Sequence, residues 1–378
     1  MKFVHISDLH LGKRLHETSL IEDQFEILKQ IIDVVRAEKP DGVLIAGDVY
    51  DKSAPSAEAV QLFDGFLAEL TSLHTRTFVI SGNHDSPERI AFGGRIMGAS
   101  GVHLSPVYSG KVEGITLTDS HGEVCVYMLP FIKPAHVRRF YADEEINSYT
   151  DAVRVAVANM GVDEGKRNVL ITHQFVTGAS RSDSEETVGG TDNVDASAFD
   201  VFDYVALGHL HGAQNCAGER IRYCGTPLKY SFSEVNDKKS VTIIELKEKG
   251  SALSVRTLPL TPIRDLRKIK GSFAELTDPK FYRTQNLEDY LQITLTDEDD
   301  VPNAMGRLQT IYKNALELKY DNARTRAQAE IYADEQVENK SMLELFAEFF
   351  ANKNGAEMSA EQSAYIADLI EKIEEERV

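Results

Sequence analysis

Polar side chains of metal-binding types follow five apolar runs of the sequence, directly after each run ends. A β-strand is the structure typical of such runs, which read KFVHIS, DGVLIAG, TFVISG, NVLIT and DYVALG. The oxygen and imidazole groups after them suit Mn²⁺, Fe²⁺ or Zn²⁺. They belong to Asp8, His10, Asp48, Asn83, His84, His173, His209 and His211. These groups are too many for one ion, and two ions bridged by a carboxylate typically activate water for attack on phosphorus. The pattern therefore predicts a two-metal phosphoesterase.

Two of the clusters carry side chains at positions i and i+2, which point to the same side of an extended chain. Asp8 and His10 can thus reach one ion, and His209 and His211 can do the same. Asp48 follows a glycine, whose missing Cβ lets backbone and metals approach closely. Because a carboxylate can bridge two ions and a neutral imidazole cannot, Asp48 is the expected bridge.

Any single strand-end histidine has a simpler interpretation, as a residue that only hydrogen-bonds a loop. The conjunction favours function, since five of the eleven histidines fall in these clusters beside acidic and amide partners. The six others are interpreted as ordinary residues: His5, His16, His74, His103, His121 and His136.

Strand-like runs alternate with amphipathic stretches over residues 1–262, an order that predicts parallel strands with crossover helices. Helical spacing is carried first by Phe25, Leu28, Ile31, Ile32 and Val35, and then by Val60, Phe63, Phe66, Leu67 and Leu70. The strand ends are expected to bring the metal ligands to one end of one sheet. Later strands are closely spaced, so the predicted fold class is α/β, with two stacked sheets flanked by helices.

The segment PLTPIRDLRKIKGSF is interpreted as a domain boundary, because it combines two prolines with a basic run. A small β-α-β module is expected after it, giving a second domain at 263–335. Residues 336–378 then form a helical pair, in which Ser359 and Gln362 open the second helix as a capping box. The apolar faces of these helices need either the body of the protein or a partner helix.

The formal charge of −19 argues against a protein that coats nucleic acid through its overall field. Acting on DNA would require local basic loops, bound cations or a basic partner. No apolar run approaches the roughly 20 residues of a membrane span, and no cleavable signal is seen, so we expect a cytoplasmic protein. Cys125, Cys216 and Cys224 are expected to be free and buried.

The order D-x-H, G-D, G-N-H-D, H and G-H-x-H resembles that of the calcineurin-like metallophosphoesterases. Within that superfamily the chain resembles the bacterial SbcD family of nuclease subunits. The stretches that carry this resemblance are DLHLGK at 8–13, GDVYD at 47–51, GNHDSPERI at 82–90, YVALGHLH at 204–211 and YCGTPLKYSFSE at 223–234. It covers essentially the whole chain, and it implies a metallophosphoesterase sandwich with a small α+β capping domain and a C-terminal helical pair.

The resemblance also implies a role for each ligand. Asp8, His10, Asp48 and His211 would hold one Mn²⁺, while Asp48, Asn83, His173 and His209 would hold the other, with Mg²⁺, Fe²⁺ or Zn²⁺ as alternatives. His84 would stabilise the transition state or protonate the leaving oxygen. The implied activity is 3′→5′ exonuclease and endonuclease cutting of DNA ends and hairpins. The implied partners are DNA, a second copy of the chain, and an SbcC-like coiled-coil ATPase, in a heterotetramer bound through the C-terminal helices.

One position departs from the archaeal relatives, which carry histidine three residues after the bridging aspartate, where this chain has Asp51. A carboxylate there can accept a hydrogen bond from His84 and orient its ring, so Asp51 is the second catalytic candidate. Lys52 and Ser53 replace the Arg-Gly of phosphatases, which disfavours a phosphomonoesterase. Lys13, Arg14, Arg89 and Lys229 are candidate phosphate contacts or solvated charges, and Tyr230 and Phe232 either line a DNA cleft or pack in the core.

Two other functions compete with the nuclease. A small-molecule phosphodiesterase would share the metal site but would have no need of partner-docking helices. A non-catalytic scaffold subunit would have lost ligands, whereas this sequence retains the full set.

Overall fold

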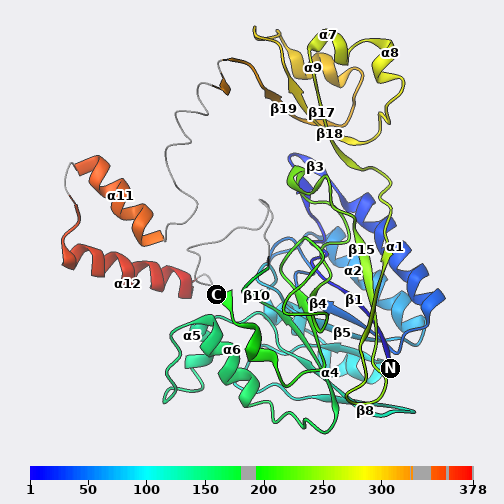
Figure 1. Cartoon of the computed structure of the whole chain (residues 1–378), viewed down its shortest axis with the longest axis vertical. Coiled ribbons are helices and arrows are strands. Elements are labelled where there is room, and N and C mark those ends of the chain that lie inside the picture. Colours follow the sequence, from blue (N-terminus) through cyan, green and yellow to red (C-terminus); the bar gives the residue numbers. More distant parts are fainter. Residues whose placement is uncertain (180–192, 324, 327–341, 355–356, 377–378) are drawn as a thin grey trace.

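Two six-stranded sheets form the body of the protein, whose computed structural model describes residues 1–179, 193–323, 325–326, 342–354 and 357–376 (Figure 1). Across the first sheet the strands are β16 (Ser254–Pro259), β15 (Ser240–Glu245), β1 (Lys2–Ile6), β4 (Gly42–Ala46), β5 (Arg76–Ile80) and β6 (Val102–Leu104). The last four are parallel, so their carboxyl ends share one edge. The strands β15 and β16 pair antiparallel beside β1.

The second sheet repeats this plan with other strands. Its order is β13 (Gln214–Asn215), β14 (Ile221–Tyr223), β12 (Tyr204–Gly208), β9 (Arg167–His173), β8 (Gly122–Met128) and β7 (Ile115–Asp119). The four central strands β14, β12, β9 and β8 are parallel. The expectation of one ligand-bearing sheet was therefore wrong, because β9 and β12 pair with each other, and with β8 and β14, rather than with β1, β4 and β5.

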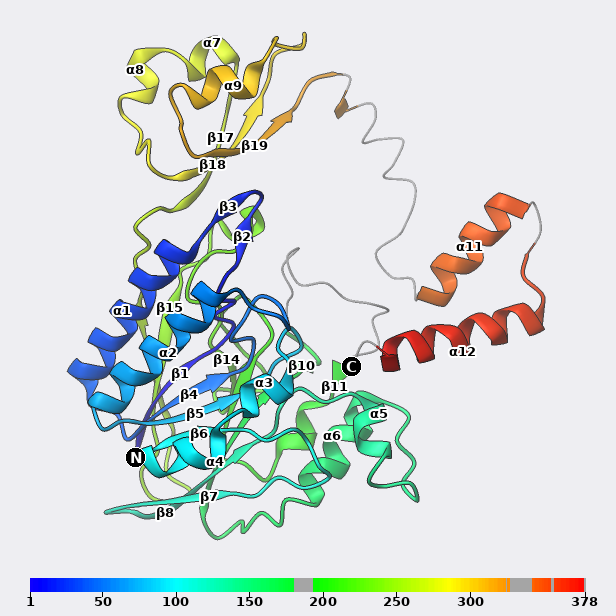
Figure 2. The ribbon, with the colours of Figure 1, turned by 180° about the vertical axis from the view of Figure 1, so that it is seen from behind.

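The sheets pack face to face around an apolar layer that includes Phe3, Phe78, Val126, Ile171 and Tyr204. The helices α1 (Ile21–Glu38) and α2 (Ala57–Ser72) cover the outer face of the first sheet (Figure 2). The outer face of the second sheet is covered by α5 (Pro134–Arg138) and α6 (Tyr149–Ala158). This arrangement confirms the predicted two-sheet α/β sandwich with flanking helices.

The apolar faces of α1 and α2 follow the predicted spacing with two exceptions. Phe25 and Val60, both expected in the core, are 55% and 45% exposed. Each lies at the edge of its helix stripe, and Ile27 and Ala59 take the buried positions.

Shorter elements complete the body. They are β2 (Arg14–Leu15), β3 (Thr18–Ser19), α3 (Pro87–Ala91), α4 (Gly94–Met97), β10 (Phe175–Val176), β11 (Asn193–Val194) and three 3₁₀ turns at Gly98–Ser100, Ala196–Phe199 and Phe232–Glu234.

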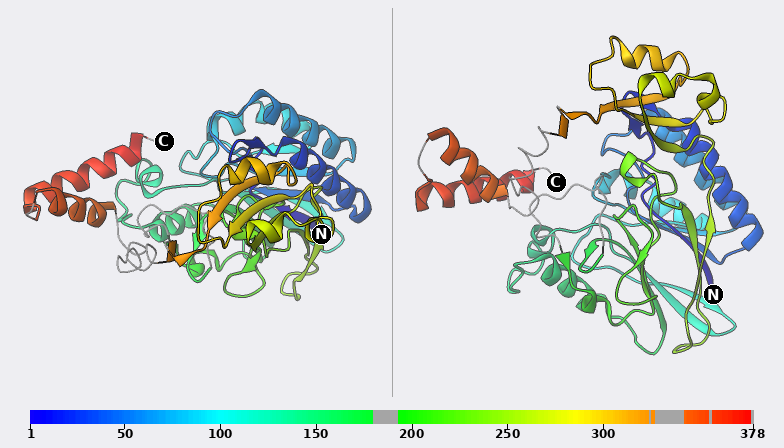
Figure 3. Two further views of the ribbon diagram at one scale, coloured as in Figure 1. Left: turned by 90° about the horizontal axis from the view of Figure 1, so that it is seen from above. Right: turned by 45° about the horizontal axis from the view of Figure 1, so that its top comes forward.

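A separate three-stranded sheet lies beyond the body, above it in the right view of Figure 3. Its parallel strands are β17 (Leu266–Gly271), β18 (Tyr290–Leu295) and β19 (Ala315–Tyr320), with α7 (Phe273–Leu276), α8 (Pro279–Tyr282) and α9 (Ala304–Gln309). Leu291, Ile293, Leu308 and Tyr312 form its core. The strand β17 falls in the segment that we interpreted as a boundary, because its lysines and arginine hide the inward-facing Leu266 and Ile269.

The last described elements are α11 (Met342–Asn354) and α12 (Ala360–Glu376), which pack against each other apart from the body in Figures 1 and 2. Ser359 and Gln362 exchange the two hydrogen bonds of a capping box, which confirms that helix start. Phe349 and Tyr365 are 57% and 67% exposed. This pair of helices therefore leaves large apolar side chains in contact with solvent.

All three cysteines are free and buried, as expected. Within the described ranges, no helix has the length and apolar character needed to cross a membrane.

Candidate metal centre

The loops after β1 and β4 run side by side, joined by backbone hydrogen bonds. The amides of Asp8, His10 and Leu11 donate to the carbonyls of Gly47, Asp48 and Val49 at 2.9–3.0 Å. Asp8, His10 and Asp48 have positive φ angles of 53°, 43° and 47°, a region that costs free energy for residues other than glycine. The surrounding bonds hold this strained backbone in place and turn the side chains of the three residues inward.

The second sheet contacts these loops at Gly208, at the end of β12, and at Gly47, after β4. A Cβ on Gly208 would lie 1.9 Å from the carbonyl oxygen of Ala46, and one on Gly47 would lie 2.5 Å from Nδ1 of His173. Only glycine allows the ends of β4 and β12 to approach this closely. The approach brings ligands from the two sheets into one site.

Three overlapping clusters of potential ligand atoms result, each with atoms within 4.8 Å of one another. They are Asp8 with His10 and His211, His10 with Asp48 and His84, and Asp8 with Asp48 and His173. Asp48 therefore belongs to two of the three clusters, as do Asp8 and His10.

Asn83 joins the remaining imidazoles to the site. Its Oδ1 lies 3.0 Å from Nε2 of His173 and 3.0 Å from Nδ1 of His209. Nδ1 of His173 lies 2.8 Å from the carbonyl of Ala46, so it carries the proton of that bond and its Nε2 faces the carboxylates. That nitrogen is 3.3 Å from Oδ2 of Asp48.

The donor set fits divalent cations. Neither ring nitrogen of His10, a buried residue, has a hydrogen-bond partner among the described residues. Burial alone would lower the pKa of His173, but the carboxylates of Asp48 and Asp8 raise it to about 9. Burial raises the pKa of Asp8 to about 6, with His173 opposing the rise and Asp48 adding to it. Buried acceptors that converge in this way create a strong demand for positive charge, which metal ions would meet.

His84 lies at the exposed side of the cluster, with 42% of its side chain accessible. Its backbone amide donates to Oδ1 of Asp48 at 2.9 Å, and its Nδ1 lies 3.1 Å from the backbone carbonyl of Asp51. Nε2 is thereby turned toward the site, 4.0 Å from Oδ2 of Asp48.

The Asp51 carboxylate does not make the predicted hydrogen bond to His84. It lies instead 2.8 Å from Nζ of Lys13 and 3.8 Å from Nδ1 of His10. The backbone carbonyl of Asp51 supplies the orienting contact because the loop after Asp48 turns that carbonyl toward the ring.

Two supporting carboxylates were missed in the sequence. Asp85 accepts the amides of Val49, Tyr50 and Gly82 at 2.9–3.1 Å and so ties the β4 loop to the β5 loop. Burial, with the nearby Asp48 charge, raises its pKa to about 7. Its place at the end of the GNHD motif was an available signal.

Glu234 is the other supporting carboxylate. Its Oε1 lies 3.0 Å from Nδ1 of His211, and its Oε2 accepts a 2.7 Å bond from Lys239. Burial alone would raise the pKa of Glu234, but His211 and Lys239 lower it to about 2. Glu234 closes the YCGTPLKYSFSE stretch, yet nothing in its spacing connects it to His211, 23 residues earlier.

The basic and aromatic residues that were candidates for contacts to DNA differ in their exposure and in their partners. Lys229 forms a 2.8 Å ion pair with Asp265, and Lys13 pairs with Asp51. Arg89 is exposed. Tyr230 and Phe232 are buried at 3% and 6% exposure, which confirms core packing over a DNA cleft.

Comparison with known proteins places this geometry in a family context. The calcineurin-like phosphoesterase profile matches residues 1–213, and the profile described as the type 5 capsule protein repressor C-terminal domain matches residues 262–354. An SbcD subunit of the nuclease SbcCD from Staphylococcus epidermidis is 32% identical over 98% of both chains. The protein of the same name from Staphylococcus saprophyticus is 34% identical over 84% of both.

Solved structures give a more distant match. The crystal structure of a dimetal phosphatase from Danio rerio is similar at 13% identity and a TM-score of 0.42, covering 69% of this chain and 99% of that one.

Proposed function

Because the chain belongs to the SbcD family of nuclease subunits, within the calcineurin-like phosphoesterases, we propose that it is a Mn²⁺-dependent DNA nuclease. Its activities would be 3′→5′ exonuclease on double strands and endonuclease on single strands and hairpins. One observation carries the proposal: ligands from five strand ends converge on Asp48 where the two sheets meet.

The proposal has two metal positions. Asp8, His10, Asp48 and His211 would hold one Mn²⁺, and Asp48, Asn83, His173 and His209 the other. When bound, such a pair supplies an acidified water and neutralises charge on the attacked phosphate. Ala46 and Glu234 fix the tautomers of His173 and His211 through their Nδ1 atoms, which leaves Nε2 of each ring to act as the ligand atom.

His84 is the proposed catalytic residue. The carbonyl of Asp51 accepts its Nδ1–H, and Nε2 then faces the site, where it can donate a proton to the leaving oxygen or stabilise charge on the phosphate. Its exposure lets it reach a substrate that approaches from solvent.

Three parts of the chain would divide the work: a nuclease domain at 1–262, a capping domain at 263–335 and a partner-binding tail at 336–378. Exposed Phe349 and Tyr365 suit docking of the tail on the coiled coil of an SbcC-like ATPase. The complex would be a heterotetramer containing two copies of this chain, in the cytoplasm.

The activity is tested by digestion of hairpin and blunt-ended DNA in Mn²⁺, with and without such an ATPase, beside cyclic nucleotides as competing substrates. Cleavage of DNA and not of cyclic nucleotides is expected. Turnover of cyclic nucleotides alone would favour the small-molecule phosphodiesterase, and the absence of any turnover would favour the scaffold.

The docking role is tested by Phe349→Glu and by truncation after residue 335. Both variants should cut short single-stranded DNA in Mn²⁺ at the wild-type rate and fail to co-purify with the ATPase. Co-purification of the truncated chain at undiminished yield would refute the assignment.

A further inference from the structure

Gln24, in the first turn of α1, is a buried residue whose side chain is fully engaged with the loop that carries Asp8 and His10. Its Nε2 donates to the carbonyl of His10 at 2.7 Å and lies 3.3 Å from that of Leu9. Its Oε1 accepts the amide of Gly12 at 3.0 Å. One carboxamide thus holds the backbone of Leu9, His10 and Gly12, in addition to the backbone bonds from the β4 loop.

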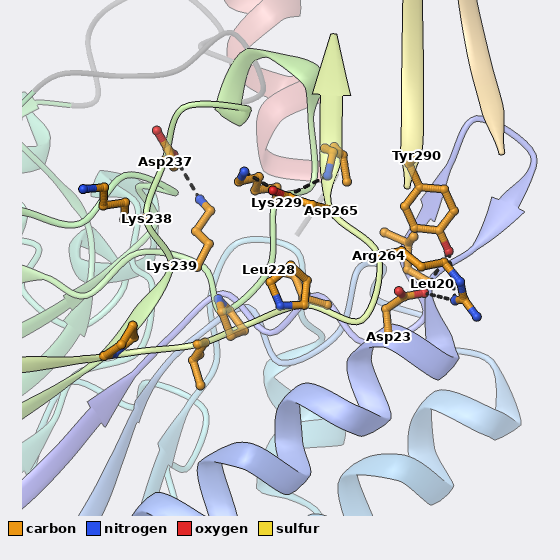
Figure 4. A pocket seen from close by; sticks show the side chains of 15 residues that line it. Leu20, Asp23, Leu228, Lys229, Asp237, Lys238, Lys239, Arg264, Asp265 and Tyr290 are labelled. Atoms are coloured by element: carbon orange, nitrogen blue, oxygen red, sulfur yellow. Dashed lines mark hydrogen bonds and ion pairs between the residues drawn. The ribbon is translucent and has the colours of Figure 1, made fainter. Parts of the chain in front are cut away.

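The residue before Gln24 faces the capping domain. Oδ2 of Asp23 accepts the hydroxyl of Tyr290 at 2.8 Å and Nη1 of Arg264 at 2.9 Å. Tyr290 is the first residue of β18 and is 3% exposed, and Arg264 also pairs with Glu22. Figure 4 shows the Tyr290 and Arg264 side chains meeting Asp23 at the end of α1.

A second connection joins the capping domain to the same metal loop. Lys229 forms its ion pair with Asp265, between the body and β17. The next residue, Tyr230, donates its hydroxyl to the carbonyl of Leu9 and lies 3.2 Å from Nε2 of Gln24. Both connections therefore end at the backbone of the metal loop.

The junction itself is not tightly filled. A cavity of about 230 Å³ separates the Asp23 contacts from the lysine side of the junction and is lined by both (Figure 4). Polar contacts, together with Leu266 and Tyr290 in the hydrophobic cluster of the body, hold the capping domain on this side. Asp23 and Lys229 are each one residue from a contact to the metal loop.

We propose that Gln24 is a positioning residue for the metal site. Through Asp23, Tyr290 and Arg264, the position of the Gln24 side chain depends on the position of the capping domain relative to the body. Adjacent residues of one helical turn move together, so a shift of the capping domain displaces the His10 carbonyl and with it the His10 ring. The inference rests on the proposed metal centre and adds a control on its affinity.

The test is calorimetric titration of the full chain with Mn²⁺ in the absence of DNA. Gln24→Met keeps the side-chain volume, adds no charge and removes every bond to the loop. It should weaken binding at one position by about tenfold or more, as is usual for residues that orient ligands. The matched control is Gln30→Met on the same helix, whose amide bonds only the backbone of Thr261 and should leave the affinity unchanged.

Tyr290→Phe isolates the contribution of the capping domain, because it removes a single hydroxyl. A loss of about threefold is expected. Its control is Tyr312→Phe, which removes a buried hydroxyl bonded to Leu276 within the capping domain.

The outcomes separate the two proposals. Failure of the wild-type chain to bind Mn²⁺ would remove the proposed function. Wild-type affinity in folded Gln24→Met, while the parent binds two ions, would overturn this inference alone. If Gln24→Met does not fold, Tyr290→Phe decides the matter, and unchanged affinity there refutes the link to the capping domain.

Discussion

The two sheets of the body bring different chemistry to one site. The first sheet supplies all the oxygen ligands proposed, from Asp8, Asp48 and Asn83, whereas the second supplies only imidazoles. The loops of the first sheet are tied to each other by backbone bonds and by Asp85. The imidazoles of His173 and His211 are instead each fixed by one acceptor, Ala46 or Glu234.

This difference predicts which substitutions should have the largest effect on metal binding. In the proposed site the charged oxygens of the first sheet would provide the attraction for two cations, so their removal should empty the site. Each imidazole of the second sheet would contribute to one position, so its removal should weaken that position and spare the other.

The largest effect is expected from Asp48→Ala. Because the proposal places Asp48 in both ligand sets, both Mn²⁺ equivalents should be lost together and DNA cleavage should fall to background. Elemental analysis of the purified variant measures the loss, with Asp64→Ala, an exposed position on α2, as the control. Two full equivalents retained in Asp48→Ala would break the comparison.

His84→Ala should come next, with cleavage reduced on the order of 10²-fold or more and both metals retained, as for loss of an acid catalyst. Single-turnover cleavage and metal content are the paired measurements. Asp51→Asn should cost less, since the carbonyl that orients His84 belongs to the backbone and survives the change. Loss of metal from His84→Ala would assign it to the ligands instead.

A smaller effect is expected on the second sheet. Glu234→Gln should weaken one Mn²⁺ position by about 10- to 100-fold and leave the other intact, because the carboxylate orients the ring of His211. Calorimetry should then resolve two unequal sites. Equal weakening of both sites would mean that the second sheet is not the independent contributor described above.

The smallest effect on activity is expected at the opposite end of β9. Arg167, six residues before His173, bonds the carbonyl of Leu246 at 3.0 Å and the Asp119 carboxylate at 2.5 Å, joining the sheets away from the chemistry. Asp119→Asn should lower the free energy of unfolding by about 2 kcal/mol at pH 7 without changing cleavage.

The pH dependence of that loss has a definite sign. The hydrogen bonds from Arg167 hold the pKa of Asp119 well below its usual range. The ionised carboxylate therefore stabilises the fold fully above the unfolded-state pKa, near 4, and this contribution declines as the pH falls from there toward the lowered pKa of the folded state. Urea unfolding at pH 7 and pH 3 should show a larger difference between wild type and variant at pH 7 than at pH 3.

Much of the site could be predicted from the sequence because each ligand directly follows a buried strand. Parallel strands place their carboxyl ends at one edge, so Asp8, Asp48 and Asn83 could be grouped without a structure. The pairing of β9 and β12 in a second sheet could not, since no local pattern distinguishes a strand of one sheet from a strand of the other.

Other features were hidden for different physical reasons. Glu234 and Gln24 act through contacts to residues 23 and 14 positions away, and such distances carry no periodic signal. The strand β17 was masked by charges on its exposed side. The role given to the Asp51 carboxylate was wrong because side-chain chemistry cannot show that a backbone carbonyl lies nearer to the ring.

The most direct test of the proposed two-metal site is a crystal structure with Mn²⁺, measured at the manganese absorption edge. Two anomalous peaks should appear, both ligated by Asp48. One should be flanked by Asp8, His10 and His211, and the other by Asn83, His173 and His209. A single peak, or two peaks that do not share Asp48, would contradict it.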